Sequence, residues 1–246
     1  MPLREELEEQ GQWLFSWRSF LPLPLVALIA WGVCLPDHAA HRQATAPVWE
    51  WLCLAVCCAG LAVRALVIGH APRRTSCRST KHQVAHQLST TGMYSIVRHP
   101  LYVGNFLIWL GLAMFTLLGW LVAVMALAYW LYYERIMLAE EEFLRRQFGT
   151  EFIAWSARTP AFIPKPGNWQ RPSLAFSPRN VLRREYSGWL AVVVGFVALQ
   201  LLSGFMGERR LQLDWPWAVA LLSAAVLYTA LRFLKRHTRL LKVEGR

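Results

Sequence analysis

The sequence predicts an all-α fold: a polytopic membrane helix bundle with about six transmembrane helices. Three observations indicate it: 55% of the 246 residues are hydrophobic, the chain holds thirteen Trp, and its apolar residues form long runs between charged segments. Apolar runs approaching 20 residues are typical of membrane helices rather than of soluble domains. The net charge of +11 would suggest nucleic acid in a soluble chain. Here the basic residues are distributed by membrane side, so we expect no nucleic-acid partner.

The first half of the chain contains two expected spans and a helical hairpin. The spans cover residues 21–35 and 48–69 and are joined by a short polar loop. Arg64 lies near one end of the second span, where a long side chain can snorkel to the interface. The apolar run over residues 101–133 is broken near its middle. It predicts a tight hairpin of two short helices, each about 20 Å long at ~1.5 Å per residue.

Two polar insertions and two further spans complete the outline. The insertions cover residues 70–100 and 134–187, and the later spans cover residues 188–205 and 215–233. With six crossings, 22 of the 26 Lys and Arg residues fall on the side that holds both insertions and both termini, and three fall opposite. The positive-inside bias then predicts an integral multi-pass membrane protein with termini and insertions cytoplasmic, in the inner or plasma membrane if the source is bacterial.

One polar passage, residues 86–105, reads HQLSTTGMYSIVRHPLYVGN. Pro100 disfavours helix at His99 and suits the first turn of a new helix, so Arg98 and His99 are expected at its mouth. A helix start has unpaired N–H groups and a partial positive charge. Together with Arg98 it would form a binding site for a carboxylate or phosphate. The alternative is a juxtamembrane loop that anchors to lipid headgroups.

A second charged passage begins at Ala139 and reads AEEEFLRRQFGTEF. The hairpin should bring it to the membrane face that holds Arg98. Three adjacent glutamates, residues 140–142, would there supply the opposite sign of charge, and a ligand with both a carboxylate and a cation would find a partner for each end. The alternative is a solvated helix start whose acids pair with Arg145 and Arg146.

No metal site is expected. The five cysteines are odd in number and four lie in apolar segments, which favours small packing residues over a disulfide framework or zinc ligands. His82 and His86 have the spacing of two ligands on a helix, but His99 is the one candidate for a third.

The two passages resemble one enzyme family. The pattern H-x-L-x-T-x-G-x-Y-S-x-x-R-H-P-x-Y-x-G over residues 86–104, followed by E-E-x-x-L, F-G-x-x-[FY] and P-x-F-I-P over residues 140–164, is similar to the core of the isoprenylcysteine carboxyl methyltransferases and related phospholipid methyltransferases. The resemblance implies a membrane methyltransferase that uses S-adenosylmethionine in a cytosol-facing pocket. The cofactor contacts that it implies are His86, Leu88, Gly92, Tyr94, Arg98, His99, Pro100, Tyr102, Glu140 and Glu141.

Three of these residues are candidates for catalytic roles. Arg98 would bind the cofactor carboxylate or orient an anionic acceptor. Glu141 would bind cofactor amino or ribose hydroxyl groups. A carboxylate or phosphate acceptor is already nucleophilic, whereas an amine would need a base, for which His99 is the nearest candidate.

The resemblance divides the chain into residues 1–166, the methyltransferase core, and residues 167–246, a linker with two further helices and a basic tail. The expected substrate is a lipid or a prenylated small molecule or peptide, with O-methylation of a carboxylate or phosphate favoured. Two other classes stay open. One is a nicotinamide-dependent isoprenoid or sterol-type reductase, and the other is a non-enzymatic membrane scaffold.

Overall fold

The computed structural model describes residues 2–18, 20, 22–72, 87–211, 213–241 and 243. These residues form helices and connecting segments, with one isolated bridge between Gly92 and Gln170 and no strand, so the predicted all-α fold is confirmed. The helices, in chain order, are α1 (Leu3–Trp17), α2 (Pro22–Val33), α3 (Pro36–His70), α4 (Met93–Ile96), α5 (Pro100–Met114), α6 (Gly119–Phe148), α7 (Thr150–Arg158), the 3-10 helix η1 (Pro166–Asn168), α8 (Pro178–Glu208) and α9 (Trp215–His237).

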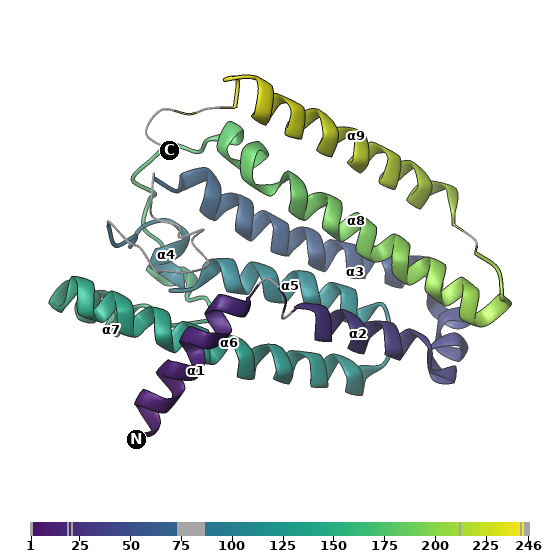
Figure 1. The fold of residues 1–246 in the computed structure, drawn as a ribbon, viewed down its shortest axis with the longest axis horizontal. Coiled ribbons are helices and arrows are strands. Elements are labelled where there is room, and N and C mark those ends of the chain that lie inside the picture. The colour runs from purple at the N-terminus through teal and green to yellow at the C-terminus, as the bar shows by residue number, and fades with distance from the viewer. Residues whose placement is uncertain are drawn as a thin grey trace.

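The long helices lie side by side, and the polar segments gather at one end of the bundle. In Figure 1, α9 packs on the outside of α8, α8 lies against α3, and α3 lies against α5, while α4, α7 and the connections beside them collect at the left. The end of α3, the start of α5 and the start of α8 all meet at this left-hand end. The helical hairpin predicted around residue 116 is confirmed as α5 and α6.

Four helices are long and apolar enough to cross a membrane: Val48–His70 within α3, Gly119–Phe148, Pro178–Gly207 and Trp215–His237. Two shorter apolar helices, Leu23–Val33 and Pro100–Met114, accompany them. At ~1.5 Å per residue, these two are shorter than a hydrocarbon core of about 30 Å. The chain is therefore a membrane protein with at least four candidate spans, and the count of six crossings stays a prediction.

Two sequence-based expectations about element boundaries are wrong. The polar loop expected before residue 48 is helical, because α3 begins at Pro36. Its early residue His38 is buried, with Nδ1 donating to the Thr116 carbonyl oxygen (2.9 Å) and Nε2 lying 2.9 Å from the Ser203 hydroxyl oxygen. The second hairpin helix is not short, since α6 continues through the charged passage to Phe148.

Small residues allow α3 and α5 to approach closely. A Cβ placed on Gly60 would lie 2.5 Å from the backbone oxygen of Gly104, and one on Gly111 would lie 2.5 Å from the backbone oxygen of Cys53. Interfaces of membrane helices favour such residues. The hydrophobic effect does not drive helices together in lipid, so their association depends on close van der Waals packing, which small residues allow. The close contact at Gly104 holds the first turn of α5 against α3. Arg98 and His99 immediately precede this turn.

Candidate active site

The start of α5 is held by backbone hydrogen bonds that join the two motif passages. His99 is the N-cap of α5 and Pro100 occupies its first turn, as predicted. The Arg98 N–H donates to the Pro160 carbonyl oxygen (2.9 Å), and the His99 N–H donates to that of Ala161 (3.2 Å). Pro160 and Ala161 belong to the P-x-F-I-P motif, so this motif holds the main chain of Arg98 and His99 in place at the start of α5.

Two of the three successive glutamates on α6 face this helix start. The Tyr102 hydroxyl donates to Glu140 Oε1 (2.7 Å), and His99 Nδ1 lies 3.5 Å from Glu140 Oε2. Glu141 Oε1 lies 3.0 Å from His99 Nε2 and 3.2 Å from Arg98 Nε. The predicted meeting of acids with the arginine and histidine is therefore present in the structure.

His99 is positioned to carry a proton on each ring nitrogen. Its side chain is buried and stacks on the Tyr102 ring. Burial by itself lowers the pKa of His99, but hydrogen bonds and charge from Glu140 and Glu141 outweigh it and raise that pKa above the ordinary value of 6.5. Only the imidazolium form has two N–H groups to direct at two carboxylates, which is why these two contacts raise the pKa of His99.

A cavity of about 460 Å³ opens beside these residues. This volume lies within the range of roughly 300–1,000 Å³ that small-molecule and cofactor sites occupy. Its lining includes seven of the ten predicted cofactor contacts: Leu88, Tyr94, Arg98, His99, Pro100, Tyr102 and Glu140.

The other three predicted contacts differ in position. Glu141 does not line the cavity itself, but it contacts two residues that do, Arg98 and His99. Gly92 has φ +62°, a backbone conformation that favours glycine, and a Cβ there would lie 3.2 Å from the Pro172 side chain. This glycine shapes the loop and is not among the lining residues. His86 falls outside the described residues, as does His82, and the described residues hold no group of three or more His, Cys, Asp or Glu that could bind a metal ion.

An apolar cluster joins α7 to the segment over residues 88–94, which precedes α5. Leu88, Phe152 and Trp155 are buried together, with Tyr94 packed against them. The Trp155 indole N–H donates to the Tyr94 carbonyl oxygen (3.1 Å). Predicted contacts Leu88 and Tyr94 are thus held by residues of the second passage.

A second group of charged residues on the cavity wall was missed by the sequence analysis. Arg64 of α3 donates from Nε and Nη2 to the carboxylate of Glu185 of α8, at 2.7 and 2.8 Å. Asn105 of α5 accepts from Arg64 Nη1, and all three residues line the cavity together with Arg184. The expectation that Arg64 snorkels is wrong, because this buried partner holds it inside the bundle. A single charge within an apolar run was the available signal.

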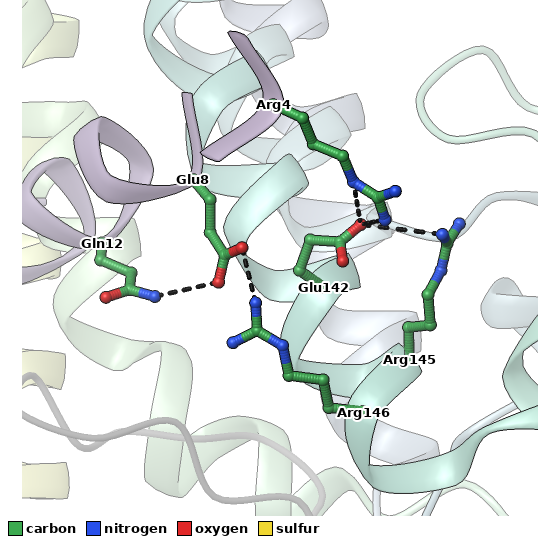
Figure 2. Close-up of polar contacts among 6 residues, drawn as sticks. All are labelled: Arg4, Glu8, Gln12, Glu142, Arg145 and Arg146. Atoms are coloured by element: carbon green, nitrogen blue, oxygen red, sulfur yellow. Dashed lines mark hydrogen bonds and ion pairs between the residues drawn. The ribbon is translucent and has the colours of Figure 1, made fainter. Parts of the chain in front are cut away.

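The N-terminal helix α1 covers another part of the cavity through Phe15 and Arg18. Figure 2 shows how α1 docks on the charged end of α6: Arg4 pairs with Glu142, and Arg146 pairs with Glu8 at 2.7 Å. Successive helical residues point about 100° apart, so Glu142 can face α1 while Glu140 and Glu141 face the start of α5. The predicted pairing of acids with Arg145 is present for Glu142 at 3.9 Å.

Comparisons with known proteins agree with the motifs. The family model described as phospholipid methyltransferase matches residues 52–151. The protein-S-isoprenylcysteine O-methyltransferase B of Arabidopsis thaliana is 30% identical over 110 residues, 40% of this chain and 55% of that protein. The protein-S-isoprenylcysteine O-methyltransferase of Schizosaccharomyces pombe is 35% identical over 88 residues, 35% of this chain and 36% of that protein.

A bacterial relative is also similar. A nickel-cobalt-cadmium resistance protein of Alcaligenes xylosoxydans xylosoxydans is 34% identical over 152 residues, 61% of this chain and 63% of that protein. The chain thus spans less than two thirds of the length of each of these relatives. No solved structure matches it. The resemblance carried by the two motif passages is confirmed: residues 52–151 match the phospholipid methyltransferase family model, and the chain is similar to isoprenylcysteine O-methyltransferases.

Proposed function

We propose that this chain is a membrane methyltransferase that uses S-adenosylmethionine to methylate a carboxylate or phosphate oxygen of a lipid or prenylated acceptor. The observation that carries the proposal is the cavity at the start of α5, where Arg98 and His99 meet Glu140 and Glu141 across the hairpin. The family match gives the reaction class, and the opposite charges on one wall suit a cofactor that carries both an ammonium and a carboxylate.

The residues present fit that cofactor. Arg98 Nε is buried and makes no hydrogen bond to a described residue, although it lies 3.2 Å from Glu141. Arg98 also lines the cavity, next to the start of α5, whose dipole favours a negative charge, so the Nη groups of its guanidinium are the donors that a bound carboxylate would meet. Glu140 lines the cavity and offers a carboxylate to an ammonium or a hydroxyl group.

The protein's own part in the reaction is positioning and the exclusion of water. S-adenosylmethionine, when bound, supplies an electrophilic methyl group and leaves as a neutral thioether. Glu141 fixes Arg98 and His99, and the stack of His99 on Tyr102 closes one side of the cavity. These contacts pre-organise the site, which is the main contribution that an in-line displacement requires.

The partners of His99 favour an oxygen acceptor over an amine. Its two ring nitrogens lie 3.5 Å from Glu140 Oε2 and 3.0 Å from Glu141 Oε1, so both are engaged by carboxylates and neither is left to take a proton from an amine. A carboxylate or phosphate oxygen is ionised near neutral pH and needs no base. This supports the O-methylation that we propose.

We further propose that the cavity faces the cytosol. The support is the excess of Lys and Arg in the segments at that end of the bundle. Labelling of a single engineered cysteine in the 167–176 segment by a membrane-impermeant reagent checks this: reaction only after the cells are opened is expected, and reaction in intact cells contradicts it.

Cofactor binding tests the function. Calorimetry on detergent-purified protein is expected to show binding of S-adenosylhomocysteine and none of reduced nicotinamide dinucleotide. Arg98→Ala should abolish that binding, whereas Arg158→Ala, at the exposed end of α7, should keep it. Binding of the nicotinamide cofactor in preference to S-adenosylhomocysteine would support a reductase. Binding of neither compound would support a scaffold. Either result contradicts the proposal.

Turnover with a labelled methyl donor identifies the product. Purified protein is incubated with radiolabelled S-adenosylmethionine and a total membrane lipid extract, and the extract is then separated by thin-layer chromatography. A labelled product is expected that is base-labile if the acceptor is a carboxylate, because methyl esters release methanol under alkali. If the acceptor is a phosphate, the product is a base-stable acidic lipid, because dialkyl phosphates resist alkali. Label in a base-stable amine fraction would contradict O-methylation while retaining the enzyme class.

A further inference from the structure

The wall of the cavity formed by α3 and α8 carries its own charged group, which the proposed cofactor contacts do not use. Arg64 and Glu185 form a two-point ion pair, and the Glu185 side chain is 2% exposed. Asn105 of α5 completes the group. Asn105 lies three residues beyond Tyr102, so the two side chains occupy neighbouring positions on α5. Helix α5 therefore contacts both charged groups: Asn105 accepts from Arg64, and Tyr102 donates to Glu140.

An ion pair in this position is not needed to attach α8. The start of α8 is already joined to the end of α3, because the Asn180 side-chain amide donates to the Ile68 carbonyl oxygen (2.7 Å) and the Ser177 N–H donates to that of Gly69 (2.9 Å). Removing two charges from water is costly, and a buried pair is weak evidence for stability. Charged residues between membrane helices mark ligand paths by default.

The pair leaves Arg64 with hydrogen-bonding capacity. A guanidinium has five N–H donors, and the described contacts use three: two to Glu185 and one to Asn105. The two remaining donors belong to Nη1 and Nη2. Arg184 lines the same cavity. This wall therefore presents two guanidinium groups, those of Arg64 and Arg184, beside the Glu185 carboxylate.

We infer that Arg64 and Arg184 bind the anionic group of the methyl acceptor, with Glu185 as the residue that positions Arg64. This inference rests on the proposed function and adds to it a division of the cavity. The cofactor takes the wall of His99 and Glu140, and the acceptor's carboxylate or phosphate takes the wall of α3 and α8. Because α8 lies outside the matched residues 52–151, acceptor choice then depends on a helix beyond the family core.

Binding measurements with matched probes test the inference. The protein is saturated with S-adenosylhomocysteine, which cannot donate a methyl group. Four probes are then titrated: N-acetyl-S-farnesylcysteine, which carries one carboxylate, its neutral carboxamide, farnesyl phosphate and farnesol. The two anions distinguish a prenylated amino acid from a lipid phosphate as the source of the charge. At least one anion is expected to bind about tenfold more tightly than its neutral counterpart, as for a charge-assisted hydrogen bond.

Three variants assign the effect to this wall. Arg184→Gln and the charge-neutral double variant Arg64→Gln with Glu185→Gln should each weaken the preferred anion about tenfold. Arg183→Gln is the matched control, since it removes the same charge from the adjacent position of α8 but does not line the cavity, and it should bind as the unmodified protein does. S-adenosylhomocysteine affinity should be unchanged in all three, which also shows that each variant is folded.

The outcomes separate this inference from the proposed function. Loss of S-adenosylhomocysteine binding in the unmodified protein would remove both. Normal cofactor binding with no preference for an anion, or with an anion preference that survives in Arg184→Gln and in the double variant, would overturn the inference alone. If the double variant does not fold, Arg184→Gln against Arg183→Gln decides.

Discussion

Replacing Glu141 by Gln should weaken cofactor binding, because this carboxylate holds both cations at the start of α5. Its Oε1 lies 3.0 Å from His99 Nε2 and 3.2 Å from Arg98 Nε. The substitution keeps the shape and an acceptor oxygen but removes the charge. A hydrogen bond to a charged group contributes about 1.5–3 kcal/mol. Loss of one such contribution corresponds to roughly a tenfold to hundredfold higher dissociation constant.

Glu142→Gln is the matched control on the same helix. Glu142 pairs with Arg4, whose side chain is 55% exposed, and points away from the cavity. Exposed ion pairs contribute little, so this variant should change the dissociation constant by less than about fivefold. Calorimetric titration of both variants with S-adenosylhomocysteine measures the difference, and thermal unfolding in detergent confirms that both are folded. Equal affinities for the two variants would refute the role of Glu141.

Three further results are expected. His99 has a raised pKa, so its contribution to stability is present below pH 6.5 and is lost as pH rises through the raised pKa. The melting temperature should therefore fall over that pH window. His99→Gln should make the melting temperature depend less steeply on pH. Gly60→Val places a Cβ 2.5 Å from a backbone oxygen of α5 and should lower stability by about 1–3 kcal/mol, whereas Gly119→Ala, which has open space, should be tolerated in the same melting experiment. Trp155→Phe removes the donor to the Tyr94 carbonyl oxygen and should lower stability by about 1–3 kcal/mol in denaturant titrations, and an unchanged midpoint would show that the hydrogen bond contributes nothing.

The motif passages were sufficient to predict most of the site. Pro100 fixed the start of α5, and the break near Thr116 predicted the hairpin that brings Glu140 to His99. These are local signals, because a proline, a short polar break and a charged run act within a few residues. The catalytic assignments of Arg98, His99 and Glu141 stay predictions until the variants are measured.

Other features could not be predicted because they depend on distant partners. The polar residues after Pro36 looked like a loop, yet His38 is buried in helix by partners 78 and 165 residues away. The residues after 133 looked like the start of a polar insertion, yet α6 continues through them to Phe148, and α1 packs along this helix.

The sequence by itself determined that this is an apolar helix bundle with an arginine–histidine helix start and a glutamate-rich helix end on the same face. Composition and local breaks carry that information, since burial in lipid and helix termination are properties of short segments. Only the tertiary structure decided that Arg64 meets Glu185, 121 residues later, inside the cavity. The identity of a charge's partner depends on how whole helices pack, and no local pattern records it.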